Sequence, residues 1–309
     1  MRIHQSFETL PTLNYPVVTI GTFDGVHNGH KAILNRLHEL AKMHGGESIV
    51  LTFTPHPRTI LFPEDHGISL LTDALEKRHQ IEQCGIDHLI EFQFTTEFAH
   101  KSAFEYVRDL LAIGIGAKKV IIGYDHRFGR GREGNFKTLT ELATVFNFEV
   151  EEIPAVLIEN NEISSSKIRK ALEQGDVKYA NHALEYNYGI RGKVIHGDAK
   201  GRTIGFPTAN LQLEENLKLL PCNGVYHVEV YVKENCWKGA MNIGVRPTVT
   251  NLGTRSIEVH ILDFTDDIYG MEIEVRLLQK IRDEMKFDSF IALKDQLQKD
   301  IEFVRNYTI

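Results

Sequence analysis

Residues 16–30 read PVVTIGTFDGVHNGH, and this stretch decides how the first half of the chain folds. It opens with a β-branched apolar run that stops at Gly21, which predicts a buried strand. After the glycine-containing turn, apolar residues recur at helical spacing until Gly45 and Gly46 end the segment. The residues on this helical face are Ile33, Leu34, Leu37, Leu40 and Ala41. The sequence therefore predicts a strand, a turn and an amphipathic helix in direct succession.

Apolar runs of strand length continue to alternate with segments of helical spacing as far as residue 174. Continuous apolar strands that alternate with helices are typical of a parallel sheet with helices on both faces. The fold class expected for this half is α/β, of the Rossmann-like kind. Strands are expected at 48–54, His88–Phe92, Lys119–Ile122 and Phe148–Ile153, and helices near Ser102–Ile113, Lys137–Phe146 and Ser164–Gln174.

The pattern changes near residue 186, and we place the domain boundary at 184–188. The first domain is then 1–185 and the second 186–309. From Tyr188 to Leu278 the second consists of short runs separated by turn residues, with clear period-2 alternation. Such runs predict a small antiparallel β-barrel. The tail from Ser289 has helical spacing, and it is expected to pack on the barrel through Ile291, Leu293, Leu297, Ile301 and Val304.

The length of the chain allows two such domains, and its composition argues against nucleic-acid binding, a disulfide framework and a membrane span. The chain has 309 residues and a formal net charge of −7, so as a whole it repels nucleic acid. Three widely spaced cysteines without a CxxC pair favour a reducing compartment over a disulfide framework. No apolar run approaches the ~18 residues of a membrane span, and the N-terminus lacks a signal-peptide core. We expect a cytoplasmic protein with small-molecule partners and without nucleic-acid or membrane partners; nothing in the sequence indicates an oligomer.

Two histidines stand at the start of the first predicted helix. His27 and His30 are three residues apart, so both rings can face an anion at the helix N-terminus. The string from Gly21 to His30 resembles the HxGH signature of nucleotidylyltransferases, in the GxFDGVHxGH form of prokaryotic FAD synthetases. This resemblance implies catalytic roles for both histidines in the transfer of AMP. The contacts to ATP or flavin that it implies come from Gly21, Phe23, Asp24 and Gly29.

A second string, ISSSKIR, occupies residues 163–169. Its serines favour a helix cap and leave N–H groups for phosphate oxygens. It resembles the (I/V)SSTxIR motif that the same family pairs with HxGH, with Ser166 where threonine is usual. The resemblance implies phosphate contacts from Ser164 and Ser165 and a catalytic role for Arg169.

Two loops between these strings extend the resemblance. Residues 54–58, TPHPR, follow a predicted strand at its C-terminal end, where open α/β sheets place ligands. Residues 123–134 resemble the GxDFRFGxxRxG loop of the family, although His126 replaces the usual aromatic residue. The ligand contacts that the two loops imply come from Pro57, Arg58, Asp125 and Phe128.

The longest motif lies in the second half, where residues 192–210 read GKVIHGDAKGRTIGFPTAN. This string resembles the riboflavin kinase signature GxVxxGxxxGRxxGxPTAN almost position for position. The resemblance implies that Thr208 and Asn210 help to bind Mg²⁺, an ion that prefers hard oxygen ligands. The implied contacts to ATP and flavin are Gly192, Gly197, Gly201, Arg202, Gly205 and Pro207.

Later stretches resemble the same kinase. Residues 242–248, NIGVRPT, and 258–264, EVHILDF, correspond to its NxGxRPT and ExHxxDF patterns. A kinase that acts on a primary alcohol benefits from a carboxylate that accepts the hydroxyl proton, and the resemblance gives that role to Glu258. Taken by itself, a glutamate in an alternating strand is usually a solvated outward residue. Further ligand contacts are implied for Asn242, Arg246 and Arg282.

Together the strings resemble the bifunctional riboflavin kinase/FMN adenylyltransferases, with the transferase first. That family phosphorylates riboflavin to FMN with ATP and then transfers AMP from ATP to FMN, which gives FAD and pyrophosphate; Mg²⁺ is the implied cofactor. Three alternatives stay open: a class I aminoacyl-tRNA synthetase fragment, a protein with one live active site, and a flavin-binding module without catalysis. The chain lacks the KMSKS-type lysine loop of the first alternative, and its intact motif residues count against the last.

Overall fold

The computed structural model describes residues 1–62, 69–154, 163–197, 201, 205–213, 217–245 and 255–307. The chain divides into two compact units, Met1–Ser165 and Ser166–Ile309. The first unit carries an open sheet and the second a closed barrel, so each has its own core.

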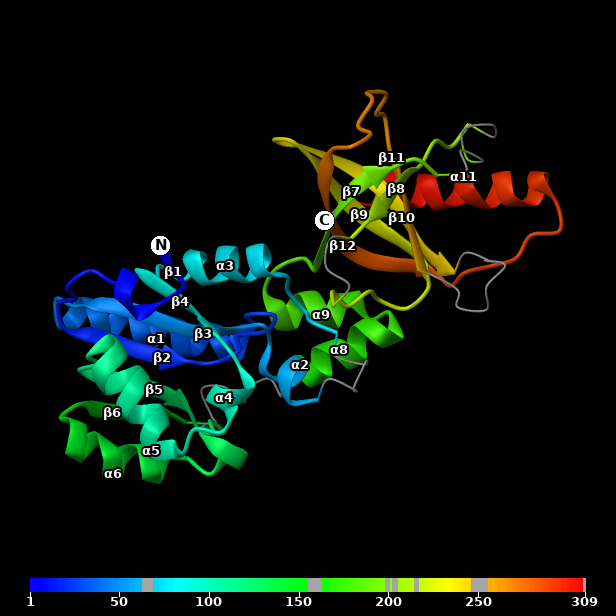
Figure 1. The fold of residues 1–309 in the computed structure, drawn as a ribbon. Coiled ribbons are helices and arrows are strands. Elements are labelled where there is room, and N and C mark those ends of the chain that lie inside the picture. Colours follow the sequence, from blue (N-terminus) through cyan, green and yellow to red (C-terminus); the bar gives the residue numbers. More distant parts are fainter. Residues whose placement is uncertain are drawn as a thin grey trace. The chain divides into compact units, whose positions relative to one another are not determined.

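The first unit is built on a six-stranded parallel sheet with the order β1-β4-β3-β2-β5-β6 (Figure 1). The central strands β2 and β3 are buried over almost their whole length, as expected for a sheet covered on both faces. The strands are β1 (Arg2–His4), β2 (Pro16–Ile20), β3 (Glu47–Thr54), β4 (His88–Gln93), β5 (Lys119–Gly123) and β6 (Glu149–Ile153).

Helices α1 and α3 cover one face of this sheet, and α5, η2 and α6 cover the other. Helix α1 buries its predicted apolar stripe against Val17 and Val50, whereas the next residues, Val18 and Leu51, face the opposite core. The helices are α1 (Asn28–Met43), α2 (Pro57–Leu61), α3 (Ala74–Gln83), α4 (Thr96–Ala99), α5 (Ala103–Tyr106), α6 (Phe136–Phe146), the 3₁₀ turns η1 (Phe7–Thr9) and η3 (Arg130–Arg132), and the π-helix η2 (Val107–Ile115).

The expected parallel α/β fold is confirmed, and the strands lie within two residues of their expected bounds. The helix expected near Ser102–Ile113 is α5 continued by η2, which ends at Gly116 in the left-handed region (φ 69°). Several short or weakly patterned elements, among them β1 and α3, were not found from the sequence. Strand β1 is only three residues long, and α3 has a single buried residue, Ile81, so neither has a periodic pattern to detect.

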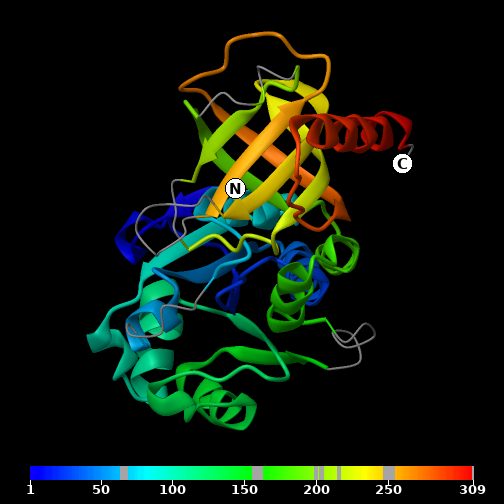
Figure 2. The ribbon, with the colours of Figure 1, turned by 90° about the vertical axis from the view of Figure 1, so that its right-hand side faces the viewer.

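The second unit contains a closed six-stranded antiparallel barrel with the order β10-β11-β8-β7-β12-β9 (Figure 2). Alternate residues fill its interior, as the period-2 patterns predict; Tyr226, Val228 and Val230 of β9 are fully buried. The strands are β7 (Gly189–Ile195), β8 (Ala209–Gln212), β9 (Gly224–Val232), β10 (Asn235–Val245), β11 (Arg255–Ile261) and β12 (Glu272–Arg282).

Helix α11 (Phe290–Asn306) packs on the outside of the barrel, which confirms the expectation for the tail. Its C-terminal half makes the contact, where Ile301 and Val304 meet Phe206 and Leu262. Ile291 was wrongly placed on the packing face: its side chain is 75% exposed, because the first turn of α11 lies beyond the apolar cluster.

Helices α8 (Ser165–Gln174) and α9 (Val177–Leu184) group with the barrel, so the contact division falls before the boundary expected at 184–188. Helix α9 buries Ala180 and Leu184 completely. The amide of Asn181 donates to the carbonyl of Leu277 in β12 at 2.8 Å. These contacts tie the helical connector to the second unit.

Candidate active sites

The first candidate site is the turn between β2 and α1, whose backbone is strained. Phe23 and Val26 have φ angles of 49° and 38°, a region that side-chain-bearing residues rarely adopt. Each such residue costs roughly 1–3 kcal/mol and persists only where its surroundings hold it. Gly25 takes the same region (φ 83°) without that cost. Strain of this kind concentrates at functional loops.

Asp24 holds this turn to two other segments. Its Oδ1 accepts hydrogen bonds from the backbone N–H groups of Leu71 and Thr72 at 2.9 and 3.2 Å. The Thr72 hydroxyl oxygen accepts the N–H of Gly25 at 3.1 Å. The hydroxyl of Ser165 donates to the Asp24 carbonyl at 3.0 Å. The Asp24 carboxylate, implied as a ligand contact, is 4% exposed, and its visible role is to shape the turn.

The two histidines lie together at the N-terminus of α1. His27 is the N-cap residue, and its Nδ1 accepts the backbone N–H of His30 at 3.4 Å. This hydrogen bond leaves the ring proton of neutral His27 on Nε2. The two rings stack with centroids 3.8 Å apart and planes 15° apart. Gly29 is buried in the first turn of the helix between them.

His30 carries an unpaired polar atom at this site. Its Nδ1 is buried and has no hydrogen-bond partner among the described residues. Burial and the neighbouring His27 hold the pKa of His30 well below its usual value. A buried imidazole nitrogen without a partner is costly, and an incoming phosphate oxygen would satisfy it. The arrangement can therefore accept an anionic ligand.

The other ligand contacts implied for this unit lie mostly at the carboxyl edge of the sheet. Pro57 and Arg58 begin α2, directly after β3, and Asp125 is exposed in the loop after β5. Phe128 does not fit its expected role. Its ring is 5% exposed within the core and packs on Tyr106 at 5.1 Å, so it supports the loop and presents no open face to a ligand.

The serine string begins α8, as expected for a helix cap. Ser164 precedes the helix, Ser165 is its first residue and Arg169 lies about one turn later. From Ser166 onward the helix belongs to the second unit. The structure therefore joins Ser165 to the turn through Asp24, while Arg169 lies in the second unit.

The second candidate site is a row of polar side chains across three barrel strands. The register places Asn210 of β8 opposite Glu258 of β11, and Glu258 opposite Asn242 of β10. Side chains at directly paired positions share one face, with Cβ atoms about 5 Å apart. The alternating neighbours Ile257 and Val259 are buried in the barrel, so the row lies on its outer face. Glu258 thus faces outward as alternation predicts, but it stands between two amides.

Gly197, which follows β7, lies against one end of this row. Asn210 is 7% exposed, and a Cβ at Gly197 would collide with its side-chain amide. The backbone N–H of Phe206 donates to the carbonyl of Gly201 at 2.8 Å, which closes the turn that leads to Thr208. Thr208 is partly exposed two residues before Asn210. Of the oxygen-bearing side chains of the PTAN motif, the register places that of Asn210 beside Glu258.

Arg282, for which the kinase resemblance implies a ligand contact, is paired with Asp300 in the structure. Its guanidinium forms a bidentate salt bridge with Asp300 of α11, with distances of 2.8 and 3.1 Å. Asp300 is 2% exposed and also accepts the amide of Gln296 at 2.9 Å. Because a buried carboxylate needs a paired cation, Arg282 docks α11 on the barrel.

The other residues for which the kinase resemblance implies ligand contacts include buried, exposed and undescribed positions. Gly192 is buried within β7, and Gly205 and Pro207 are exposed in the loop before β8. Arg202 and Arg246 lie outside the described residues. Sequence reasoning missed Thr72 and Asp300. Only Asp300 left a signal, because it interrupts the apolar stripe of α11 next to Ile301.

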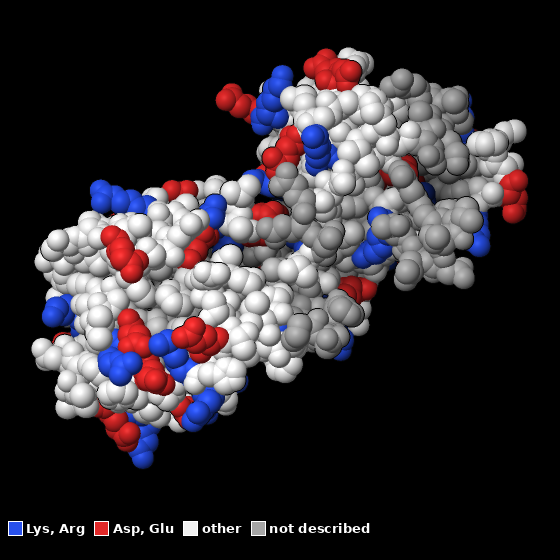
Figure 3. All heavy atoms as spheres, in the orientation of Figure 1, with Lys and Arg blue, Asp and Glu red and all other residues white. Residues whose placement is uncertain are grey.

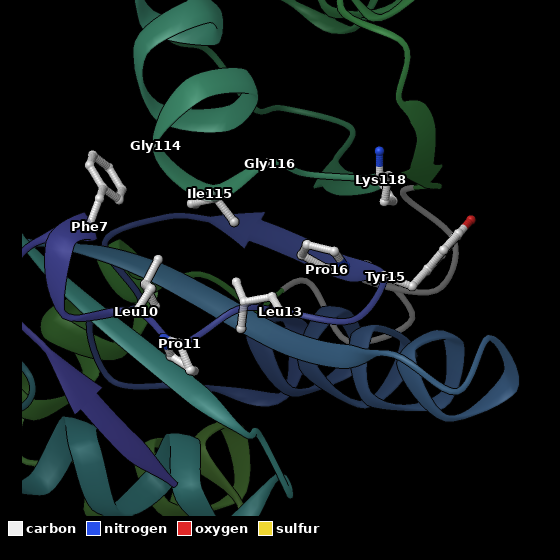
Figure 4. A pocket seen from close by; sticks show the side chains of 10 residues that line it. All are labelled: Phe7, Leu10, Pro11, Leu13, Tyr15, Pro16, Gly114, Ile115, Gly116 and Lys118. Carbon is white, nitrogen blue, oxygen red and sulfur yellow. The ribbon is translucent and has the colours of Figure 1, made fainter.

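A cavity of about 320 Å³ opens at the opposite end of the parallel sheet (Figure 4). It lies beside Pro16, where β2 begins, and Lys118, which precedes β5. Its other walls come from Phe7, Leu10 and the last turn of η2. Ligands of open α/β sheets bind beyond the carboxyl ends of the strands, so this cavity is not part of the candidate site.

Basic and acidic side chains intersperse on the face drawn in Figure 3, with no large patch of one sign. This distribution agrees with the net charge of −7. Within the described residues, no helix combines the length and apolar character needed to cross a bilayer.

Comparisons with known proteins identify a family for each half of the chain. Residues 11–167 match the FAD synthetase family and residues 184–308 the riboflavin kinase family. The chain is 39% identical over 285 residues to an *Escherichia coli* protein (92% of this chain, 90% of that one). It is 37% identical over 291 residues to one from *Listeria monocytogenes* (94% and 92%). Both relatives are named bifunctional riboflavin kinase/FMN adenylyltransferase.

A crystal structure from *Streptococcus pneumoniae*, titled a macrolide-efflux protein, superposes with a TM-score of 0.89. It is 33% identical, and the match covers 99% of each chain. The fold seen here is thus shared over the whole chain. The sequence matches and the two sites lead to one conclusion: the chain belongs to the bifunctional riboflavin kinase/FMN adenylyltransferase family, and it uses ATP to convert riboflavin to FMN and FMN to FAD.

Proposed function

We propose that adenylyl transfer takes place at the turn of residues 21–30. The unpartnered Nδ1 of His30, stacked beside His27 at the N-terminus of α1, carries this assignment. An oxygen of the FMN phosphate attacks the α-phosphorus of ATP, and the bond from that phosphorus to the pyrophosphate oxygen breaks. FMN is already largely dianionic near pH 7, so no general base is required.

The two histidines then act as donors to the transferring phosphate. His27 holds its proton on Nε2, and His30 donates from Nδ1 to a phosphate oxygen. An approaching phosphate favours the protonated ring, so binding raises the pKa of His30 from its depressed value. The helix N-terminus adds its positive end to the same position. On the basis of the motif resemblance, we assign Ser164, Ser165 and Arg169 to contacts with the β- and γ-phosphates of ATP.

We assign riboflavin phosphorylation to the row formed by Asn210, Glu258 and Asn242. The strand register that sets Glu258 between two amides is the observation that supports it. The primary hydroxyl of the riboflavin side chain attacks the γ-phosphorus of ATP, ADP leaves, and the Glu258 carboxylate accepts the hydroxyl proton. The flanking amides can hold the carboxylate and the substrate in one orientation.

Mg²⁺ fits the oxygen donors at the end of this row. The Thr208 hydroxyl and the Asn210 amide oxygen are hard ligands, and the absence of a side chain at Gly197 leaves the space that Asn210 occupies. We propose that these two residues hold the ion together with ATP phosphates. The ion supplies positive charge that neutralises the phosphates.

The domain limits of 1–185 for adenylyl transfer and 186–309 for the kinase, and the cytoplasmic location, stay predictions. So does the expectation that only small molecules serve as partners. The motif residues in the loops, among them Gly21, Arg58 and Asp125, are proposed to line the nucleotide and flavin.

A Mg²⁺ titration tests the kinase assignment. Thr208→Ala should lose riboflavin phosphorylation at low Mg²⁺ and regain part of it at high Mg²⁺, because it weakens ligation of the ion. Glu258→Gln should show no such rescue, because it removes the proton acceptor. Equal rescue of both variants would contradict the two roles.

An NMR titration tests the adenylyltransferase assignment. The His30 ring should titrate well below pH 6.5 in the free protein, and a non-hydrolysable ATP analogue should raise its pKa. The exposed ring of His79 serves as the control and should not respond. An unchanged His30 pKa in the saturated protein would remove this residue from the phosphate site.

A further inference from the structure

A threonine on the central strand β3 forms a hydrogen bond to the strained turn of the first unit. Thr52 of β3 is fully buried, and its hydroxyl donates to the backbone carbonyl of Thr22 at 3.2 Å. Thr22 lies directly before Phe23, the first residue with a positive φ. The contact therefore fixes the peptide plane at which the strained backbone begins.

Lys77 fixes the direction of that hydroxyl. The lysine lies on α3, and its Nζ donates to Thr52 Oγ1 at 3.3 Å. An ammonium group carries only donors, so the hydroxyl oxygen must be the acceptor. The single hydroxyl hydrogen of Thr52 is then directed to the carbonyl of Thr22. A chain of two such bonds polarises both members and strengthens each.

Helix α3 presents Lys77 from a well-anchored position. Asp73 and Glu76 form a capping box at the start of the helix. Arg78 makes a bidentate salt bridge with Glu91 of β4, at 2.6 and 2.7 Å. The segment just before the helix is also the one that Asp24 binds. The lysine side chain therefore starts from a helix that is fixed to both the sheet and the turn.

The peptide between Thr22 and Phe23 links this hydrogen bond to the direction of the Phe23 N–H. In a planar trans peptide the C=O and the following N–H point in opposite directions. With the Thr22 carbonyl held toward Thr52, the N–H of Phe23 points away from β3. That N–H makes no hydrogen bond to any residue of the described chain. The ring centroids of Phe23 and His30 are 5.2 Å apart in an edge-to-face contact. The Phe23 N–H therefore lies in the same turn as the unpaired imidazole nitrogen of His30.

We propose that Lys77 is a positioning residue for adenylyl transfer, acting through Thr52 to aim the Phe23 N–H at a nucleotide phosphate. The inference rests on the assignment of residues 21–30 to that reaction. Lys77 contributes by setting the peptide plane, and it does not need to touch the substrate. Oriented backbone donors stabilise charge that develops on phosphate, and a small misorientation can cost about 10–100-fold in rate.

A double-mutant cycle separates this role from a direct phosphate contact. Lys77→Met and Thr52→Val remove the two hydrogen-bonding groups at nearly constant volume. Each should lower kcat for FMN adenylylation about tenfold while KM for ATP changes less than about threefold. The double variant should be no slower than the slower single variant, because both act through one contact. Lys137→Met, on the exposed face of α6, is the matched control and should behave as wild type.

Losses that multiply in the double variant would overturn the proposal, and so would a raised KM for ATP with unchanged kcat in Lys77→Met. Riboflavin phosphorylation by the same samples should stay at the wild-type rate, and the nearly unchanged KM for ATP excludes misfolding of the first unit. Loss of all FAD formation by wild-type protein would instead refute the assigned function. One set of assays, which measures kcat and KM for ATP in each variant and FAD formation by the wild type, distinguishes these outcomes.

An isotope experiment observes the Phe23 N–H itself. The sequence contains only two Thr–Phe dipeptides, Thr22–Phe23 and Thr52–Phe53. Labelling threonine carbonyls with ¹³C and phenylalanine nitrogens with ¹⁵N should therefore leave two selected signals, and Thr52→Val removes one of them. The Phe23 signal should shift with a non-hydrolysable ATP analogue in wild type and shift less in Lys77→Met. An unmoved Phe23 signal, or equal shifts in both proteins, would contradict the proposal.

Discussion

The two proposed active sites differ in the backbone structure that would hold ATP beside a flavin. The adenylyltransferase turn places Phe23 and Val26 at strained φ angles and ties the loop down through Asp24 and Thr52. The kinase row uses regular antiparallel strands, and register alone aligns Asn210 with Glu258. One site depends on a loop that its neighbours must hold, whereas the other depends on strand pairing that the whole barrel maintains.

The difference predicts how each site fails. A turn held by a few hydrogen bonds should be sensitive to distant residues that fix its backbone. A row on paired strands should be sensitive mainly to the side chains in the row. Substitutions that lower the rate of one reaction without lowering the stability of the protein therefore test each site separately.

The largest expected effect belongs to Glu258→Gln. Removal of the proton acceptor should slow riboflavin phosphorylation by roughly 10²–10⁴-fold, while supplied FMN is still converted to FAD. Glu272→Gln, an exposed glutamate on β12, should leave both rates unchanged. Separate chromatographic assays for FMN and FAD give the two rates. Wild-type kinase turnover in Glu258→Gln would place the base elsewhere.

The next effect is expected for His30→Ala. Loss of one donor to the transferring phosphate should cost about 3 kcal/mol, or roughly a hundredfold in FAD formation. FMN formation should stay near normal, because the kinase row lies in the other unit. His79→Ala is the control on an exposed surface. Equal loss of both activities in a folded His30→Ala protein would argue against separate sites.

A pair of fragments should show a smaller effect, on stability. Residues 186–309 contain the kinase row and are expected to fold and phosphorylate riboflavin. Residues 166–309 also keep α9, whose buried Val177 and Leu184 should add about 2 kcal/mol of unfolding free energy. Urea unfolding of both fragments measures the difference. Equal midpoints would mean that the helical connector does not stabilise the barrel.

The smallest effect concerns His227, a buried histidine with a lowered pKa. Burial and Lys238 lower the pKa of His227 to about 4, and neither of its ring nitrogens has a partner among the described residues. The unfolded chain binds a proton near pH 6.5, so stability should be constant above that pH and fall as pH decreases toward 4.

The expected loss in the second unit is on the order of 1–2 kcal/mol between pH 7.5 and 5. His227→Leu should flatten this dependence, as measured by urea unfolding of the full chain. An ATP analogue should shift the pKa of His30 but leave that of His227 unchanged, because His227 packs against Tyr307, the C-cap residue of α11, at a ring distance of 4.9 Å. The same slope with and without His227 would exclude it as the cause.

The parts that the sequence predicts well are those with a local pattern. The α1 stripe and the alternation in β9 follow from spacing along the chain, and both were found where expected. Strand β8 was not singled out from the sequence, because it has only four residues and its first two, Ala209 and Asn210, end the kinase motif. The histidine pair was predictable from a contiguous string, but the unpaired Nδ1 of His30 requires coordinates.

Pairings between distant residues account for the remaining differences. Arg282 matched a motif position, yet its partner Asp300 lies 18 residues later on another element. Phe128 matched a flavin loop, yet it fills the core beside Tyr106. Glu258 gained its two flanking amides from register, which sequence alternation does not specify.

The most direct test of the central claim, that the two reactions take place at separate sites, is to mix His30→Ala and Glu258→Gln proteins with riboflavin, ATP and Mg²⁺. Each variant alone should fail to make FAD from riboflavin. In the mixture, FMN produced by His30→Ala should be adenylylated by Glu258→Gln, so FAD should form in multiple turnovers. FMN that accumulates without FAD, or no FMN at all, would contradict the account.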